Sequence, residues 1–147
     1  MIQIKDLGTF EAVPEIVIDI VKGNIKALEN ALVDGWDIHK PIQLDNYSEY
    51  SPLELALVIN CLPSVQWLVE HGVDLNEEEN PSFLLVVRYG TKKIIEYVVS
   101  HGANIHALNC VKLDAFEAAL YGKKYENLQI IHDLGHTVQK YGGKAFR

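Results

Sequence analysis

Histidine and cysteine are the residues of this chain whose chemistry could support a metal site or catalysis. The sequence holds six histidines and two cysteines among 147 residues. His132 and His136 are four residues apart, but Gly135 lies between them. A zinc-protease motif requires a glutamate directly after its first histidine, and no glutamate stands beside His132. Cys61 and Cys110 are too few for a disulfide framework and belong to no C-x-x-C motif. These spacings predict no metal site.

The remaining candidates for chemistry are equally weak. His71 and His101 each precede a glycine at the expected end of a helix, where the helix dipole favours a positive charge. Gly142-Gly143-Lys144 lacks the earlier glycine and the Ser or Thr of a phosphate-binding loop, and we find no nucleophile elbow. We therefore predict no catalytic residue, no metal and no cofactor, and we predict that the chain is not an enzyme. A cryptic site for a small ligand is the alternative.

Composition is typical of one soluble domain. The hydrophobic fraction is 48% and the charged fraction is 22%, near the averages for globular chains. No apolar stretch reaches about 18 residues, and the N-terminus lacks a basic region followed by an apolar run. We therefore predict no membrane span and no secretion signal. Two unpaired cysteines suit a reducing compartment, and we expect a cytoplasmic protein.

A short pattern recurs four times along the chain. It consists of glycine, a small or apolar residue, Asp or Asn, an aliphatic residue and a polar residue. The pattern begins at Gly35, Gly72 and Gly102, and in a weaker form at Gly135. The spacings are 37, 30 and 33 residues, close to the period of about 33 residues that one class of helical repeats shows.

Each repeat is predicted to be a helical hairpin. Before each glycine lies an amphipathic run, such as Val65, Leu68 and Val69, whose apolar residues recur three and four positions apart. The glycine then ends the helix in a left-handed conformation. A shorter helix precedes each run, and the second one begins with a Ser-Pro pair at residues 51–52. In the fourth repeat the turn glycine, Gly122, comes one place early.

The string Ser51-Pro52-Leu53-Glu54-Leu55-Ala56 resembles the Thr-Pro-Leu-His-x-Ala signature of ankyrin repeats. The segments at Gly72 and Gly102 resemble the Gly-Ala-Asp-Val-Asn ending of that family. The resemblance implies an all-α ankyrin-repeat solenoid, a single domain over residues 1–147. Glu54, Leu84 and Glu117 replace the signature histidine, which usually hydrogen-bonds between neighbouring repeats. The expected parts are an N-terminal cap at 1–13, repeats at about 14–39, 51–76, 81–106 and 114–139, and a tail at 140–147.

The same resemblance implies that a partner protein binds the concave side, which consists of loops and the exposed ends of the first helices. The corresponding positions are Val58 and Ile59 in the second repeat, Arg88 and Tyr89 in the third, and Tyr121 in the fourth. Aromatic residues with an arginine among them are typical of interface hot spots. The alternative is that irregular loops fold back and bury these side chains.

Two loops add candidate binding residues. The longest connection, residues 41–50, carries Tyr47 and Tyr50 and follows Trp36; long aromatic loops on rigid scaffolds often serve recognition. A tolerated insertion is the alternative. Glu77-Glu78-Glu79 lies in a shortened loop and could bind basic side chains, while a solvated charge run is the plainer explanation.

Charge is distributed unevenly along the chain. Residues 1–80 hold 15 Asp and Glu against 4 Lys and Arg, whereas residues 81–147 hold 5 against 9. The acidic part favours a basic partner protein. Lysine pairs at residues 92–93 and 123–124 could form a stripe, but the pI of about 5.3 is unlike that of nucleic-acid binders.

Together these features predict a protein-binding module that is a monomer when free and that binds neither nucleic acid nor a membrane. Its partner is expected to have a basic surface. An immunity or inhibitor protein that masks a basic partner, such as a toxin, is our specific interpretation, and it rests on charge. The alternative is a signalling adaptor or a host-directed effector scaffold.

Overall fold

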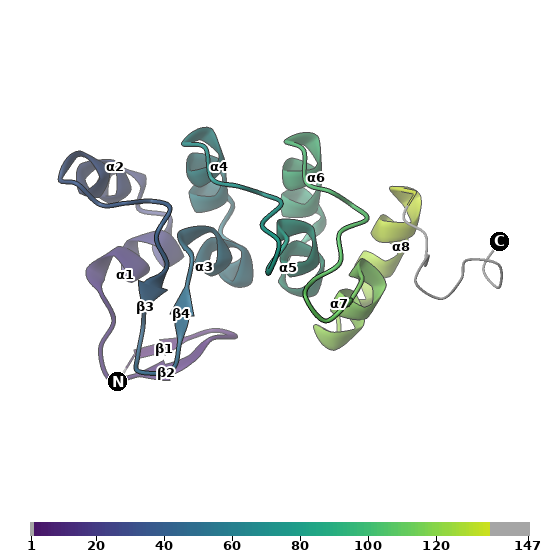
Figure 1. Ribbon diagram of the computed structural model, residues 1–147, viewed down its shortest axis with the longest axis horizontal. Helices are drawn as coiled ribbons and strands as arrows, with labels where there is room; N and C mark the ends of the chain where they lie inside the picture. The colour runs from purple at the N-terminus through teal and green to yellow at the C-terminus, as the bar shows by residue number, and fades with distance from the viewer. Residues whose placement is uncertain (1, 136–147) are drawn as a thin grey trace. The chain divides into compact units, whose positions relative to one another are not determined.

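Helical hairpins make up most of residues 2–135, the part of the chain that the computed structural model describes (Figure 1). They belong to two compact units, which we name unit 1 (Met1–Asp74) and unit 2 (Leu75–Arg147). The hairpins of unit 1 are α1 (Glu15–Lys22) with α2 (Ile25–Val33) and α3 (Pro52–Ile59) with α4 (Leu62–Glu70). Those of unit 2 are α5 (Ser82–Tyr89) with α6 (Lys92–Ser100) and α7 (Ala115–Tyr121) with α8 (Tyr125–Asp133).

The four glycines that mark the repeat end the second helix of each hairpin. The φ angles of Gly35, Gly72, Gly102 and Gly135 lie between 88° and 103°. Residues that carry a side chain rarely adopt such angles. A Cβ atom at any of these positions would meet open space. Backbone conformation, and not crowding, therefore selects glycine there, as the repeat pattern predicts.

Packing, and not conformation, selects glycine at position 122. Gly122 has φ −82° and ψ −2°, which suit any residue, and the left-handed residue of this turn is Lys123, with φ 57°. A Cβ atom on Gly122 would overlap the backbone carbonyl of Arg88. The glycine comes one place early in this repeat because the end of α7 contacts the end of α5 so closely.

Two helices begin with a complete capping box. Ser51 Oγ accepts a hydrogen bond from the Glu54 amide at 3.1 Å, and Glu54 Oε1 accepts one from the Ser51 amide at 3.0 Å. Asp114 and Glu117 repeat this arrangement at the start of α7. The helix start predicted at Ser51 is therefore confirmed, and Asp114 caps α7 in the same way. The glutamates that replace the signature histidine each satisfy an orphan amide of their own helix.

The all-α prediction is confirmed, and four short strands accompany the helices. They form two antiparallel pairs, with Ile2 opposite Phe10 and Ile42 opposite Tyr50. Strands of two or three residues are too short for a period-two pattern to be recognised in the sequence. The strands are β1 (Ile2–Ile4), β2 (Gly8–Phe10), β3 (Ile42–Gln43) and β4 (Glu49–Tyr50).

The apolar faces of the helices form the core of each unit. The fully buried core residues of unit 1 include Val17, Ile20, Leu28, Leu55, Val65 and Leu68, and those of unit 2 include Phe83, Val86, Val87, Ile95, Val98 and Ile131. No helix within residues 2–135 is long and apolar enough to cross a bilayer. The end of the fourth predicted repeat, residues 136–139, and the predicted tail, residues 140–147, lie outside the described residues. The single domain over 1–147 stays a prediction.

Candidate functional site

The longest connection, between α2 and α3, contains an ordered β-hairpin that we name the acidic finger (residues 42–50). Ile42 and Leu44 are buried and anchor its base in unit 1. The Leu44 amide donates to the Ser48 carbonyl at 2.9 Å, which closes the finger below its tip. The sequence indicated a loop here, and the structure makes it a defined projection.

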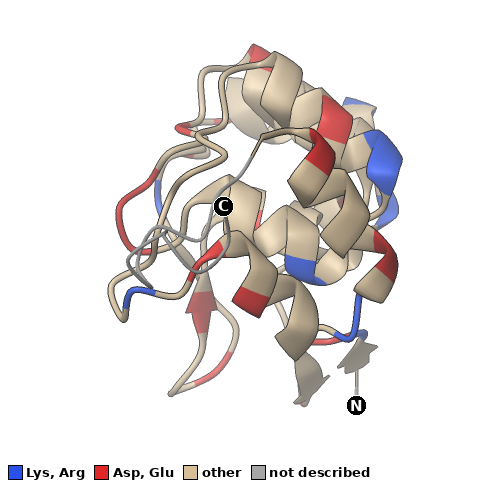
Figure 2. Cartoon of the chain, turned by 90° about the vertical axis from the view of Figure 1, so that its right-hand side faces the viewer, with Lys and Arg blue, Asp and Glu red and all other residues tan. Residues whose placement is uncertain are grey.

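The tip of the acidic finger presents one tyrosine. Tyr47 is 96% exposed, and its amide donates to Asp45 Oδ1 at 2.8 Å, which fixes the backbone of the tip. Asp45 and Glu49 flank the ring along the chain, and Figure 2 shows acidic residues in red on this hairpin. Tyr50, at the base, is half-buried. Of the two tyrosines that the sequence singled out in this loop, Tyr47 is the accessible one.

Trp36 has a structural contact of its own. Its ring stacks on Trp67, with centroids 6.3 Å apart and planes 8° apart. Trp67 is buried and in turn stacks on His71 at 4.0 Å. His71 Nδ1 lies 2.7 Å from the Trp67 carbonyl oxygen, and because a carbonyl only accepts, this nitrogen carries the proton. Trp36 therefore offers only its outer face, and its half-buried ring extends an aromatic stack in unit 1.

The end of α3 differs from our expectation. Val58 is buried, with 5% of its surface exposed, and Ile59 is half-buried. The helix is apolar on nearly all sides, with Glu54 as its one charged residue, and it packs against α1 and α4. Because such a helix is buried all round, the expected exposure of Val58 is wrong.

The corresponding ends of α5 and α7 are accessible. Arg88 is exposed and Tyr121 is 66% exposed, whereas Tyr89 is half-buried. The Arg88 guanidinium lies over the Tyr89 ring, 5.0 Å from its centroid. Since Gly122 touches the Arg88 backbone, Tyr121 lies close to Arg88. The structure thus brings the predicted residues of the third and fourth repeats together within unit 2.

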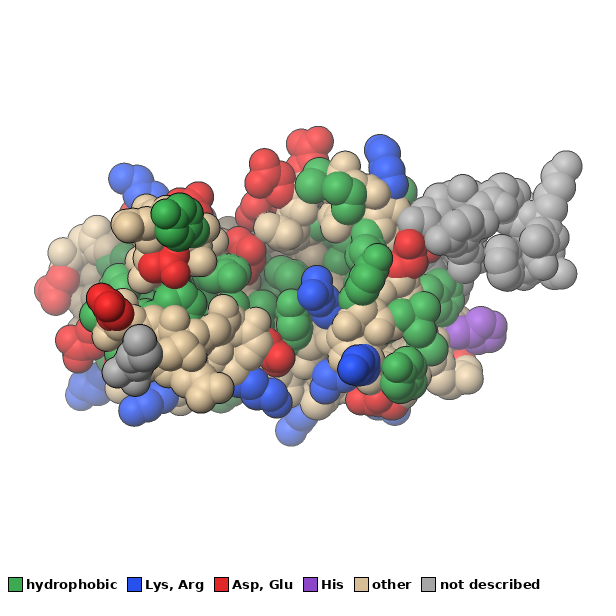
Figure 3. Space-filling view, turned by 90° about the horizontal axis from the view of Figure 1, so that it is seen from below, with side chains coloured by type: hydrophobic (Ala, Val, Ile, Leu, Met, Phe, Trp, Pro, Cys, Tyr) green, Lys and Arg blue, Asp and Glu red, His purple; other side chains and the backbone are tan. Residues whose placement is uncertain are grey.

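A small cleft lies next to these residues, and we name it the α5–α7 cleft. The sequence contains no signal for it other than the early glycine at position 122. Figure 3 shows hydrophobic side chains beside Lys and Arg side chains on this part of the molecule. The cleft has a volume of about 60 Å³. The residues that line it are Asn80, Pro81, Leu84, Leu85, Arg88, Asn109, Leu113 and Ala118.

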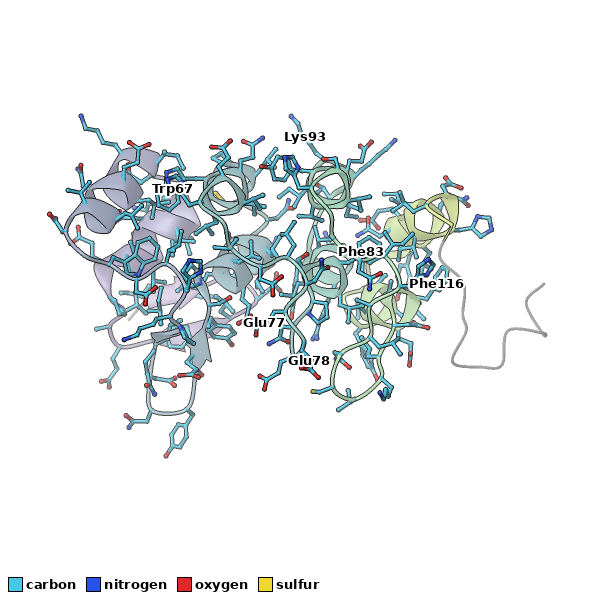
Figure 4. All side chains as sticks on the ribbon, turned by 45° about the horizontal axis from the view of Figure 1, so that its top comes forward. Trp67, Glu77, Glu78, Phe83, Lys93 and Phe116 are labelled. Carbon is cyan, nitrogen blue, oxygen red and sulfur yellow. The ribbon has the colours of Figure 1, made fainter. Side chains whose placement is uncertain are left out.

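The predicted acidic loop precedes α5 in unit 2. Glu77, Glu78 and Glu79 are all exposed, and Figure 4 shows Glu77 and Glu78 on the loop that leads into this helix. The loop is held at its start by Asn76, whose side chain donates to the Gly102 carbonyl at 3.0 Å and accepts from the Asn104 amide at 2.8 Å. The three carboxylates therefore extend from a fixed base.

Unit 1 carries most of the negative charge. Residues 2–74 hold 12 Asp and Glu against 4 Lys, whereas residues 75–135 hold 8 Asp and Glu against 6 Lys and Arg. Apart from Glu54 and Asp74, the carboxylates of unit 1 form no ion pair within the described residues. Uncompensated carboxylates of this kind produce an attractive potential for a basic partner.

Groups suited to chemistry are not assembled in the described part of the chain. Within residues 2–135 no group of three His, Cys, Asp or Glu side chains could hold a metal ion. Cys61 is half-buried and Cys110 is exposed. His101 repeats the arrangement of His71, with its Nδ1 2.9 Å from the Tyr97 carbonyl. Both histidines follow the last residue of a helix and hydrogen-bond to a carbonyl of its last turn, at the helix ends that the sequence indicated.

Comparison with known proteins supports the repeat assignment. The chain matches no protein-family model. It is 28% identical over 107 residues to the human ankyrin repeat and SOCS box protein 2, and 29% identical over 96 residues to the rat ankyrin repeat and SAM domain-containing protein 6. It is 31% identical over 100 residues to a Rickettsia felis protein described as an ankyrin repeat protein. These matches support an ankyrin-repeat fold for the chain.

These relatives share only part of their length with this chain. The matches cover 68%, 63% and 66% of the chain, but 17%, 10% and 53% of the respective relatives. The relatives support a general role in protein–protein interaction. Among the surfaces described, the acidic finger and the α5–α7 cleft are the accessible features that could carry such a role.

Proposed function

We propose that this ankyrin-repeat chain binds a partner protein with a basic surface and masks it stoichiometrically, as an immunity or inhibitor protein does for a toxin. The observation that carries the proposal is the acidic finger, an ordered hairpin with Tyr47 96% exposed at its tip. In this proposal the chain is a cytoplasmic monomer when free. Its contact surface comprises the finger and the exposed predicted residues of unit 2.

Geometry supports the finger as a recognition element. The hydrogen bonds of Leu44 and Tyr47 fix the hairpin before any partner arrives, and an ordered loop loses little conformational entropy on binding. A tyrosine supplies a large contact area with only two side-chain torsions. The Tyr47 side chain does not stabilise the fold by burial, because almost all of its surface is exposed to solvent.

Charge supports a basic partner. The finger carries Asp45 and Glu49, and the unit to which it belongs holds 12 acidic residues against 4 basic ones. Complementary potentials raise the association rate and exclude partners of the same sign. The exposed carboxylates of Glu78 and Glu79 give unit 2 a second acidic element, on the loop before α5.

An adaptor or effector scaffold is the second candidate function. The matched relatives are multi-part proteins by name, with a SOCS box or a SAM domain, and the chain spans 17% and 10% of their lengths. Affinity purification with an adaptor as bait would recover several partners. The same purification with an inhibitor as bait would recover one protein in stoichiometric amount. The number and charge of the captured proteins therefore separate the two functions.

The test is affinity purification from the native cell with the chain as bait, followed by mass spectrometry at two salt concentrations. The wild-type chain is compared with Tyr47→Ala and with Tyr125→Ala, a matched control that removes a 60% exposed tyrosine from α8. We expect one basic protein in stoichiometric amount, which is lost with Tyr47→Ala and kept with Tyr125→Ala. An acidic partner, or recovery that does not depend on Tyr47, would contradict the masking role.

A further inference from the structure

We infer that the α5–α7 cleft binds an extended segment of a partner protein, with a small apolar side chain in the cleft and a nearby carboxylate on Arg88. The inference rests on the proposed function only in taking the partner to be a protein. It concerns unit 2 and a segment that carries an acidic residue, a chemistry opposite to that expected for the acidic finger.

Side chains of α5 and α7 form two walls of the cleft and its apolar floor. On α5 the lining residues Pro81, Leu84, Leu85 and Arg88 follow the spacing of one helical face. Ala118 of α7 lines the opposite side. The volume of about 60 Å³ corresponds to roughly four water molecules, which suits a branched side chain such as valine.

The walls are fixed before a ligand binds. The buried Asn127 side chain of α8 donates to the carbonyls of Val87 at 2.9 Å and Gly90 at 3.1 Å, and so holds the end of α5. The third wall is the loop before α7, where Asn109 Oδ1 accepts from the amides of Val111 and Leu113 at 3.0 Å each. A preformed cleft of this kind loses little free energy to reorganisation on binding.

Arg88 gives one end of the cleft a cation with free donors. Its guanidinium stacks on Tyr89, and within the described residues it forms no ion pair. Stacking uses the face of the guanidinium and leaves its N–H edge for a carboxylate, which it can bind through two parallel hydrogen bonds. Tyr121, three residues after Ala118 on α7, lies beside this end and is 66% exposed.

The opposite end of the cleft has the opposite charge. Asn80 lines it, and the exposed Glu78 and Glu79 directly precede Asn80 in the chain. Arg88 lies seven positions after Pro81, the N-cap of α5. This corresponds to a rise of about 10 Å, which about three residues of extended peptide span. The carboxylate of the bound segment therefore lies at the Arg88 end, within about three residues of the apolar side chain. The same glutamates repel a phosphodiester backbone, so a peptide fits better than a nucleic acid.

The test is selection of a random peptide library against the full chain, followed by affinity measurement on the enriched peptides. We expect a consensus with Val, Ile or Leu within three residues of Asp or Glu. Arg88→Glu should weaken these peptides by about 10- to 100-fold, since a charge-assisted hydrogen bond is lost. Lys93→Glu is the matched control, because Lys93 is also an exposed cation of unit 2 and does not line the cleft. The peptide affinity of this variant should change less than about twofold.

Two further measurements separate a binding role from a folding defect. Arg88→Glu should keep the wild-type melting temperature and should bind better than wild type to a peptide in which lysine replaces the acid. Leu85→Ala, which removes apolar floor, should weaken the original peptides about three- to tenfold. The inference is overturned if no peptide is enriched, if the enriched peptides lack an acidic residue, or if they are insensitive to both cleft variants. Partner capture through Tyr47 would still stand in each of these cases.

Discussion

Val58, Arg88 and Tyr121 occupy equivalent positions near the ends of α3, α5 and α7, yet their exposure differs. Val58 is 5% exposed, whereas Tyr121 is 66% exposed and Arg88 reaches solvent. The helix that contains Val58 is apolar on nearly all sides, whereas the charge of Arg88 requires water or a partner. Position within a repeat therefore identifies a candidate contact, and the neighbouring side chains decide whether that candidate is accessible.

At the residue scale, Gly122→Ala should destabilise unit 2. The new Cβ would overlap the Arg88 carbonyl, and forced overpacking costs about 1–3 kcal/mol. Chemical denaturation of the full chain measures the change in the free energy of unfolding. Gly102→Ala is the control, because its Cβ meets open space and the positive φ alone costs about 1 kcal/mol. Equal losses in the two variants would show that the α5–α7 contact is not tight.

At the scale of elements, the third residue of a hairpin's second helix forms a hydrogen bond to the neighbouring hairpin, once in each unit. Ser64 is the third residue of α4, and its hydroxyl donates to the Ile20 carbonyl of α1 at 2.6 Å. Asn127 is the third residue of α8 and donates to the Val87 carbonyl of α5. Both side chains are fully buried. Each unit thus contains a polar bond between hairpins in a position that is otherwise suited to an apolar residue.

We expect Asn127→Ala to cost about 2–3 kcal/mol and Ser64→Ala about 1 kcal/mol. The asparagine variant removes the side-chain donor of two carbonyls, those of Val87 and Gly90. In the serine variant the Ile20 carbonyl keeps one donor, the Gly23 amide at 3.2 Å. Urea denaturation gives both values, and amide hydrogen exchange would place each loss in its own unit. Gln129→Ala is the control, because Gln129 is exposed on the same helix as Asn127. A loss below about 0.5 kcal/mol for Asn127→Ala would show that this bond does not hold α5 and α8 together.

At the scale of the whole molecule, the two units differ in their balance of acidic and basic residues. The net charge is −7, and most of the excess acid belongs to unit 1, while the α5–α7 cleft and its arginine belong to unit 2. The acidic finger and the cleft would therefore select different chemistry from a partner. One protein with a basic surface and a short acidic segment could satisfy both, and so could two separate partners.

Electrostatic steering should make association sensitive to salt. Between about 50 and 300 mM salt the association rate constant with the basic partner should fall by roughly tenfold or more, because screening shortens the range of the acidic field. Stopped-flow or surface-based kinetics would measure it. Asp45→Asn with Glu49→Gln should lower both the rate and its salt dependence while leaving the melting temperature unchanged. A rate that does not respond to salt would remove charge from the explanation.

The helical repeat could be predicted from the amino-acid sequence. The glycine spacing, the Ser51 cap and the apolar periodicity correctly placed the hairpins, because each depends on local backbone rules or on one helical face. The expected position of α5, α7 and the loop at 41–50 also followed from these signals. They extend over consecutive residues and need no knowledge of distant neighbours.

The accessibility of the candidate residues depends on tertiary packing and could not be predicted from the sequence. Tertiary packing buried Val58, stacked Trp36 on Trp67 and turned the loop around Tyr47 into a hairpin with that tyrosine outermost. It also formed the α5–α7 cleft from side chains up to 38 positions apart, between Asn80 and Ala118. Burial and concavity depend on which surfaces meet, and the contact between Gly122 and Arg88 is made by backbone atoms that residue types do not reveal.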